Sequence, residues 1–416
     1  FAMLYNWPQA APRYAQAENL FIHAGDRENA LLARLGYFWA TADVSVSPAV
    51  VEEVAKHLEE PFVQSDGNLL MRALVTKAVL DRNSNELAAR EPWERILKLA
   101  NAFGDYQWEG RAKAELGQIL YMDGDIKSAA EMLRDAIRSQ YLHGDFGGAL
   151  HYTSLVGNGF VEAGQPEAGL KYANIVLRLG SFVPDLGFPY LAYQGKARAL
   201  LAMNQTAGAE AALTEAITRA REEKHYMALA QLLVVSGTIE NLTEATRISD
   251  ENGFRHVLAW SSIELAKAYR QAGDFDRAEL WASKGIRLVR ALEDRYHLPQ
   301  DLALLADLQV RNGKLDRADE TFSEATDVLD ALLVNVTRRQ LKSSLIAALS
   351  EAYVGHFELV ARKLSNPVRA YEIIERARGR ALADTLRGES ETLTNVDNLT
   401  LQSQTEINRI PTCSDS

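Results

Sequence analysis

Apolar residues along this chain recur with the period of an amphipathic helix. In the segment 111–137, Ala112 and Leu116 share one helical face, and a second apolar face begins at Ala129 after a Gly-Asp break. Strand patterns with a period of two are hard to find. Long stretches of the chain contain no proline, a residue that destabilises helix interiors. The pattern therefore predicts an all-α chain built from helix–turn–helix pairs.

The same helix pair recurs about every 40 residues. The turn residues are 40 positions apart within two runs, which are Gly124, Gly164 and Asn204, then Gly273 and Gly313. A shorter pair is expected between these runs, with its turn near Asn241. Glycine and asparagine tolerate the left-handed backbone that tight turns need. A repeated pair that cannot bury its apolar face alone indicates an α-solenoid.

We expect one continuous array over residues 1–388, closed by a helix pair at about 338–388. Small residues such as Gly117, Ala129 and Ala318 are expected where neighbouring helices approach closely. Residues 389–416 are rich in Ser, Thr, Asn and Gln. They are predicted to form a polar linker or tail that one short helix could interrupt.

The order of small and large positions resembles the tetratricopeptide repeat (TPR). Two segments carry the motif most fully: Leu116-Gly117-Leu120-Gly124-Ala129-Leu133-Ala136 and Leu305-Ala306-Gly313-Ala318-Phe322-Ala325. The period is nearer 40 than the family's about 34 residues, and the family's tryptophan and closing proline are mostly missing. The resemblance implies a right-handed α-solenoid of TPR-like pairs.

The segment 366–388 is similar to the part that closes the TPR array in bacterial TPR–CHAT proteins. It follows a long helix expected at about 338–364. The matching residues are Ala370, Glu375, Arg376, Ala377, Arg378, Arg380, Ala381, Leu382, Asp384 and Leu386. The resemblance implies a regulatory or sensor array upstream of a CHAT domain, the catalytic module of a caspase-like cysteine protease. The family's His and Cys belong to that module, so no catalytic residue is assigned here.

Composition and charge remove several classes of function. The net charge of −11 argues against wholesale nucleic-acid binding, and no apolar run is long enough to span a membrane. The single cysteine, Cys413 in the tail, leaves no thiolate zinc site or disulfide framework. No two of the eight histidines are three to five positions apart, so we expect no metal and no cofactor. A cytoplasmic location is expected, with export as an alternative because the chain starts at Phe1 rather than Met.

The concave groove of the solenoid, which the first helix of each pair lines, is the predicted binding surface. The candidate partner-binding residues are Arg111, Gln118, Tyr121, His151, Ser154, Asn158, Gln194, Arg198, Trp260, Glu264, Lys267 and Arg270. Such a mixture of polar and aromatic side chains suits a protein or peptide partner. Asn158 and Arg198 also match two positions of a clamp that some TPR domains place around a C-terminal carboxylate. A groove that is only solvated is the remaining alternative.

Positive charge gathers near the C-terminal end of the array. Residues 338–387 contain ten Lys and Arg against five Asp and Glu. Four arginines at spacings of 7, 4 and 7 share one helical face, namely Arg369, Arg376, Arg380 and Arg387. We expect this face to dock a downstream domain in cis. A solvated face and a nucleic-acid contact are the alternatives.

Together these features predict a non-catalytic scaffold for protein–protein interaction. The favoured setting is the sensor array of a TPR–CHAT protease. The alternative is the ligand- or peptide-sensing arm of a bacterial transcription or signalling regulator. No constellation of metal ligands, phosphate-binding glycines or activated nucleophiles indicates an enzyme in this chain.

Overall fold

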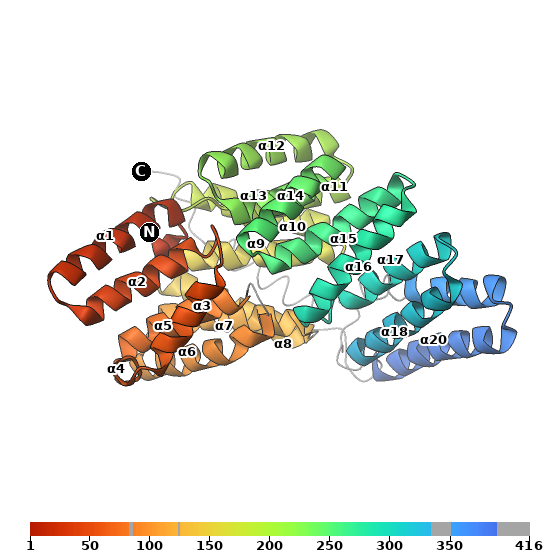
Figure 1. Ribbon diagram of the computed structural model, residues 1–416, viewed down its shortest axis with the longest axis horizontal. Coiled ribbons are helices and arrows are strands. Elements are labelled where there is room, and N and C mark those ends of the chain that lie inside the picture. Colours follow the sequence, from red (N-terminus) through yellow and green to blue (C-terminus); the bar gives the residue numbers. More distant parts are fainter. Residues whose placement is uncertain (83–85, 124, 334–350, 389–416) are drawn as a thin grey trace.

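The computed structural model describes residues 1–82, 86–123, 125–333 and 351–388. Within these ranges every regular element is helical, and consecutive helices pack in pairs (Figure 1). The pairs are α1 (Trp7–His23) with α2 (Arg27–Thr41), α5 (Gly67–Arg82) with α6 (Arg90–Phe103), α7 (Tyr106–Met122) with α8 (Ile126–Leu142), α9 (Phe146–Glu162) with α10 (Pro166–Gly180), α11 (Tyr190–Ala202) with α12 (Thr206–Glu222), α13 (Tyr226–Ser236) with α14 (Ile239–Asn252), α15 (Arg255–Gln271) with α16 (Phe275–Ala291), and α17 (Leu298–Arg311) with α18 (Leu315–Leu333). The predicted all-α array of helix–turn–helix pairs is confirmed.

Several shorter elements stand beside these pairs. They are the 3₁₀ turns η1 (Ala2–Leu4) and η2 (Glu86–Ala89), the helices α3 (Pro48–Glu59) and α4 (Pro61–Ser65), and a π-helical turn at Leu359–Lys363 that precedes α20 (Pro367–Gly388). The expected long helix at 338–364 falls partly outside the described residues, as do Gly124 and the tail at 389–416 with Cys413. The predicted linker therefore stays a prediction.

A Gly-Asp pair ends one helix and starts the next at several joints. Gly104 follows α6 with a φ of +66°, a conformation that glycine adopts without strain. The side chain of Asp105 then accepts the N–H of Trp108 (3.1 Å) and caps α7. The same arrangement joins α1 to α2, α8 to α9 and α15 to α16. These joints explain why the repeat period is readable from the sequence.

The shorter pair between the two runs of repeats turns at Gly237 and not near Asn241. Gly237 has a φ of +74°, and the hydroxyl of Thr238 accepts the N–H of Asn241 (3.2 Å). Asn241 therefore lies in the first turn of α14. The prediction was four residues late because the Gly-Thr signal, a left-handed C-cap followed by an N-cap, outweighs a lone asparagine.

Small residues lie where neighbouring helices meet most closely. Ala129 is 1% exposed and Ala318 is fully buried. A Cβ atom at Gly117 would come within 3.1 Å of Cγ of Leu133 and within 3.3 Å of the Ala129 carbonyl oxygen. α7 and α8 therefore pack through Gly117 and Ala129, with Leu133 filling the space between them.

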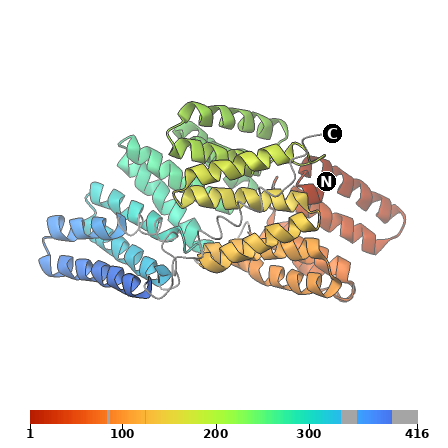
Figure 2. The same cartoon turned by 180° about the vertical axis from the view of Figure 1, so that it is seen from behind.

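The array curves back on itself, so that segments far apart in the sequence lie side by side (Figures 1 and 2). The backbone N–H of Val46 donates to the carbonyl oxygen of Asn252 (3.0 Å), and that of Met227 donates to the carbonyl oxygen of Asp43 (3.2 Å). The loop between α2 and α3 thus packs against the start of α13 and the end of α14. This curvature encloses the interior in which the candidate site lies.

Replacing Ala129 with leucine should lower the free energy of unfolding by about 1–3 kcal/mol, because the added atoms cannot fit between α7 and α8. Ala130→Leu is the matched control, since Ala130 is exposed on the same turn of α8. Chemical denaturation of the two variants measures the difference. Equal stabilities would contradict the close packing described here.

Candidate functional site

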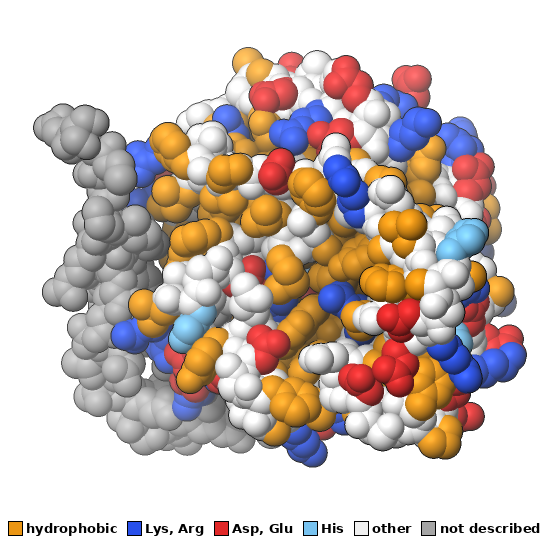
Figure 3. Space-filling view, turned by 90° about the vertical axis from the view of Figure 1, so that its left-hand side faces the viewer, with side chains coloured by type: hydrophobic (Ala, Val, Ile, Leu, Met, Phe, Trp, Pro, Cys, Tyr) orange, Lys and Arg blue, Asp and Glu red, His pale blue; other side chains and the backbone are white. Residues whose placement is uncertain are grey.

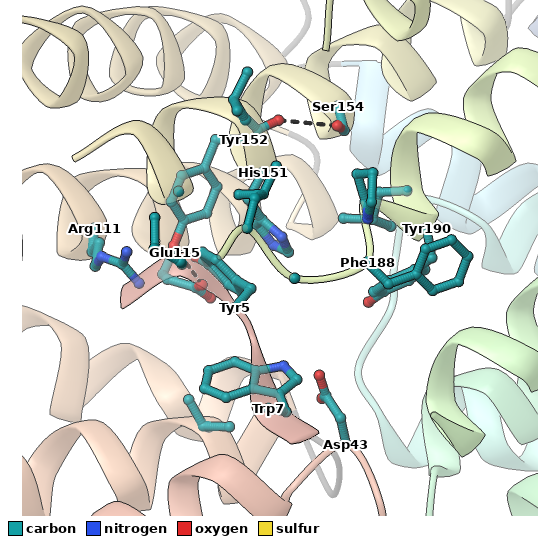
Figure 4. A pocket seen from close by; sticks show the side chains of 18 of the residues that line it. Tyr5, Trp7, Asp43, Arg111, Glu115, His151, Tyr152, Ser154, Phe188 and Tyr190 are labelled. Carbon is teal, nitrogen blue, oxygen red and sulfur yellow. Dashed lines mark hydrogen bonds between the residues drawn. The ribbon is translucent and has the colours of Figure 1, made fainter. Parts of the chain in front are cut away.

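Residues 1–6 pack against α7, α9 and the loop that precedes α11, and Leu4 and Tyr5 line a cavity inside the curved array, where Figure 4 shows Tyr5. Arg111 on α7 donates from Nη2 to the carbonyl oxygen of Met3 (2.7 Å), although the two residues are 108 positions apart. The backbone N–H of Gly187 donates to the carbonyl oxygen of Leu4 (2.9 Å). The N-terminal segment is therefore held by groups that are distant in the sequence.

Tyr5 is the central side chain of this interior. Its ring stacks on the imidazole of His151, with centroids 4.3 Å apart and planes 6° from parallel. The guanidinium of Arg111 lies 5.0 Å from the same ring centroid. Burial raises the pKa of Tyr5 to about 12. Burial, with the charges of Arg82 and Arg111, lowers the pKa of His151 to about 3. A neutral phenol thus stacks on a neutral imidazole across the physiological pH range.

Arg111 carries a buried positive charge that is fully paired. Its side chain and that of Asp145 are 2% and 1% exposed. Nε of Arg111 donates to Oδ2 of Asp145 and Nη2 donates to Oδ1, each at 2.8 Å. Asp145 also accepts the N–H of Gly148 (3.1 Å) and so caps α9. Bidentate pairing of this kind allows two charges to stay in the interior.

A small cavity of about 70 Å³ remains next to Tyr5, and its walls include Trp7, Trp39, Trp108 and Tyr190. A water molecule needs roughly 10–15 Å³ of such space, whereas sites for small organic ligands measure about 300–1,000 Å³. The cavity can therefore hold a few waters but no drug-sized ligand. The end of the molecule seen in Figure 3 is hollowed near its centre, and many of the side chains around the hollow are hydrophobic.

A second polar group, the central cluster, joins α7, α9 and α11 to the loop before α17. It comprises Tyr121, Glu162, Arg198, Tyr296 and His297. The hydroxyl of Tyr121 donates to Oε2 of Glu162 (2.8 Å), and Nη1 of Arg198 donates to Oε1 (3.0 Å). The rings of Tyr121 and Tyr296 are 4.8 Å apart. Burial alone would raise the pKa of Glu162, but Arg198, His297 and Tyr121 hold it below its ordinary value.

His297 carries a positive charge in this cluster. Burial acts to lower its pKa, but the neighbouring carboxylate of Asp294, 2.7 Å from Nδ1, together with Glu162 and Asp301, raises it to about 9. Burial raises the pKa of Asp301 on α17 to about 7, against the opposing effect of Lys267 and His297. His297 of the central cluster and the neighbouring Asp301 therefore titrate between neutral and mildly alkaline pH.

The structure divides the predicted groove residues into two sets. Arg111, His151, Ser154, Asn158 and Gln194 are buried or lie under residues 1–6. Gln118, Tyr121, Arg198, Trp260, Glu264, Lys267 and Arg270 are partly exposed. The first set belongs to the protein interior because the curvature of the array and its N-terminal segment cover it. Only the second set can meet a partner without displacing that segment.

The proposed carboxylate clamp lacks a free donor at Asn158. Its side-chain Nδ2 donates to the carbonyl oxygens of Ser154 (3.1 Å) and Leu191 (3.0 Å). Both N–H groups of the amide are thus used between α9 and α11. Arg198, the other matching residue, pairs with Glu162 in the central cluster.

The part played by residues 1–6 was not predicted from the sequence. One signal was available, because Gly147 and Gly148 stand together in the first turn of α9. Each glycine costs a helix about 0.5–1 kcal/mol relative to alanine, so a pair of them indicates a close approach of another chain segment. A Cβ atom at Gly147 would collide with the carbonyl oxygen of Met3.

Two of the four C-terminal arginines pair with α18 within the array. Arg369 forms an ion pair with Asp319 (2.6 Å). Arg376 contacts Asp330 (2.7 Å) and Asp327 (2.6 Å). These arginines hold α20 against α18. The side chains of the other two, Arg380 and Arg387, lie outside the described residues, and docking of a downstream domain stays a prediction.

Within the described ranges, no group of three or more His, Cys, Asp or Glu side chains is arranged to hold a metal ion. Among those same residues, none of the helices has the length and apolar character that a membrane crossing requires.

The pKa of His297 predicts a loss of stability with rising pH. A pKa raised from 6.5 to about 9 contributes stability that is complete below pH 6.5 and is lost as the pH rises through 9. We expect His297→Gln to remove a pH-dependent part of the free energy of unfolding that is on the order of 1 kcal/mol. The contribution is this small because 37% of the side chain is exposed and solvent screens its charge. Urea denaturation from pH 6.5 to 9 measures it.

His23→Gln is the control for this experiment, because His23 is exposed on α1 and bonds only within its own helix among the contacts described. That variant should follow the pH dependence of the wild type. A His297→Gln curve parallel to the wild-type curve would show that the raised pKa does not contribute to folding.

No family model matches the chain, and neither does any curated protein. Among solved structures, it is similar to a signal transduction ATPase with a tetratricopeptide repeat sensor from Pyrococcus horikoshii (14% identity, 77% of this chain and 54% of that one, TM-score 0.43). It is also similar to BtubC from P. vanneervenii (19% identity, 61% of this chain and 94% of that one, TM-score 0.37). A third similar structure is the apo form of RapI (13% identity, 91% of this chain and 98% of that one, TM-score 0.32). The chain spans about half of the length of the ATPase. The helix contacts of the chain itself, and not these likenesses, establish the fold.

Proposed function

We propose that this chain is a non-catalytic scaffold for protein–protein interaction, and that its partner binds along the partly exposed half of the concave surface. We call this surface the open groove, and define it by Arg198 on α11 with Trp260, Glu264, Lys267 and Arg270 on α15. The observation that carries the proposal is this set of partly exposed charged and aromatic side chains on α11 and α15. Such side chains contribute disproportionately to binding at protein interfaces.

The basic side chains of the open groove form ion pairs with carboxylates of this chain, and a partner's carboxylate could take the place of these carboxylates. Lys267 donates to Glu264 (2.7 Å), and the two side chains are 42% and 31% exposed. Arg270 lies 3.5 Å from Asp307 on α17, with exposures of 38% and 33%. Ion pairs this exposed contribute little to stability, so a partner's carboxylate can replace the internal one at low cost. The surface therefore suits a segment that carries acidic residues.

The partner we favour is a caspase-like peptidase domain of the CHAT type. The support is the resemblance of the α20 sequence to the segment that closes TPR arrays before such domains. In this setting the repeats are a TPR-like regulatory array, and the open groove contacts the peptidase domain that the array regulates. The competing assignment, a sensing arm of a transcription or signalling regulator, uses the same groove with a different attached module.

Site-specific photocrosslinking tests the groove directly. A benzoylphenylalanine in place of Trp260 should crosslink to a purified CHAT-type peptidase domain, because an aromatic side chain there would face the bound segment. The same amino acid in place of Leu280, which is 65% exposed on the second helix of the same pair, should not. Arg270→Glu should reduce the yield from position 260 several-fold by repelling an acidic segment.

The outcomes distinguish the open groove as a binding surface from the CHAT-type identity of its partner. Equal yields from positions 260 and 280, unaffected by Arg270→Glu, would contradict the open groove as a binding surface. Specific crosslinks from position 260 to a DNA-binding or nucleotide-binding module, and none to the peptidase domain, would retain the scaffold and reject the CHAT assignment.

A further inference from the structure

Residues 1–6 are held by backbone hydrogen bonds and by one side chain, Tyr5, in the way that a bound peptide is held in a site. Besides the bond from Arg111 described above, the Gly187 N–H donates to the Leu4 carbonyl oxygen (2.9 Å). The side-chain amide of Asn6 donates to the carbonyl oxygen of Asp185 (2.9 Å). Recognition through the backbone, combined with a slot for one side chain, is a common mode of peptide binding.

Two glycines shape the floor on which this segment lies. A Cβ atom at Gly147 would collide with the carbonyl oxygen of Met3, and one at Gly187 would collide with that of Tyr5. Neither glycine has a positive φ. The local backbone therefore does not require glycine at these positions, and the reason for glycine is the space that the segment needs.

The side-chain slot is specific for an aromatic ring. It is formed by the imidazole of His151, which stacks on Tyr5, and by the indole of Trp7, which meets the same ring edge to face at 5.6 Å. The guanidinium of Arg111 lies over the ring. Contacts between aromatic rings and with a cation add to the energy of burying the ring.

We infer that the surface formed by α7, the start of α9 and the loop before α11 is a binding site for a short peptide with an aromatic residue followed by asparagine. The chain's own residues 1–6 fill this site as an internal ligand, and a partner segment of the same pattern binds by replacing them. The site is separate from the open groove, so the crosslinks from position 260 do not test it.

The first experiment compares Gly147→Ala with Gly159→Ala in the full chain. Both residues lie in α9, where alanine is favoured over glycine, but a Cβ at Gly159 meets no atom within 4 Å. Hydrogen exchange should show residues 1–6 released in the Gly147→Ala protein and unchanged in the Gly159→Ala protein. Equal protection of residues 1–6 in both proteins would overturn the assignment of the site.

The second experiment supplies the peptide in trans. The full chain with Tyr5→Ala has a weakened internal ligand, and we expect it to bind a fluorescent peptide of residues 1–7 roughly 10- to 100-fold more tightly than the wild type does, because the tethered wild-type segment competes at high effective concentration. Adding Gly147→Ala should abolish binding by fluorescence anisotropy, and adding Gly159→Ala should not. A peptide with alanine at the tyrosine position should not bind.

Two results of the peptide experiment would refute the inference. One is a folded Tyr5→Ala chain that fails to bind the peptide, and the other is equal binding by the Gly147→Ala and Gly159→Ala derivatives. If Tyr5→Ala does not fold, the hydrogen-exchange comparison decides by itself, since neither of its glycine substitutions removes an aromatic side chain.

Discussion

The buried ion pair of Arg111 and Asp145 connects two neighbouring repeats, through α7 and α9, to the N-terminal segment that packs against them. Asp145 caps α9 and accepts two hydrogen bonds from Arg111 on α7, while Nη2 of the same arginine also holds the carbonyl oxygen of Met3. Removing either partner would leave a buried charge unpaired, at a cost of about 3–5 kcal/mol. One pair of side chains thus fixes the packing of two neighbouring repeats and the floor on which the N-terminal segment lies.

This constraint explains why the concave surface has two parts with different character. Toward α7 and α9 it is an aromatic interior whose ionisable groups are paired internally or held neutral, as His151 is by its lowered pKa. Toward α11 and α15 it keeps partly exposed charges, of which Lys267 and Arg270 are examples. The first part binds a segment through its shape and its backbone hydrogen bonds, whereas the second part can form ion pairs with a protein partner.

The helix pairs, their period and the close approaches at alanine could be predicted because they depend on neighbours in the sequence. A Gly-Asp joint such as Gly104 with Asp105 acts over one turn, and Ala129 meets the adjacent helix. The interior could not be predicted, because it depends on the accumulated curvature of many repeats. Arg111 was predicted to line the concave side, and nothing in a 40-residue pattern indicates that Met3 meets it. The central cluster could not be predicted for the same reason, because Glu162 and His297 come close only when the array curves.

Curling also changes how the array should unfold. In an open solenoid each repeat contacts only its neighbours, so stability is close to a sum of local terms. Here the loop before α3 bonds to α13 and the end of α14, and Tyr121 on α7 packs on Tyr296 before α17. These contacts form only when all of the intervening repeats are in place, so their free energy is lost as soon as any one of those repeats opens. The repeats from α3 to α17 are therefore coupled as one cooperative unit, whereas α18 and α20, which are tied to each other by Arg369 and Arg376, lie outside that closure.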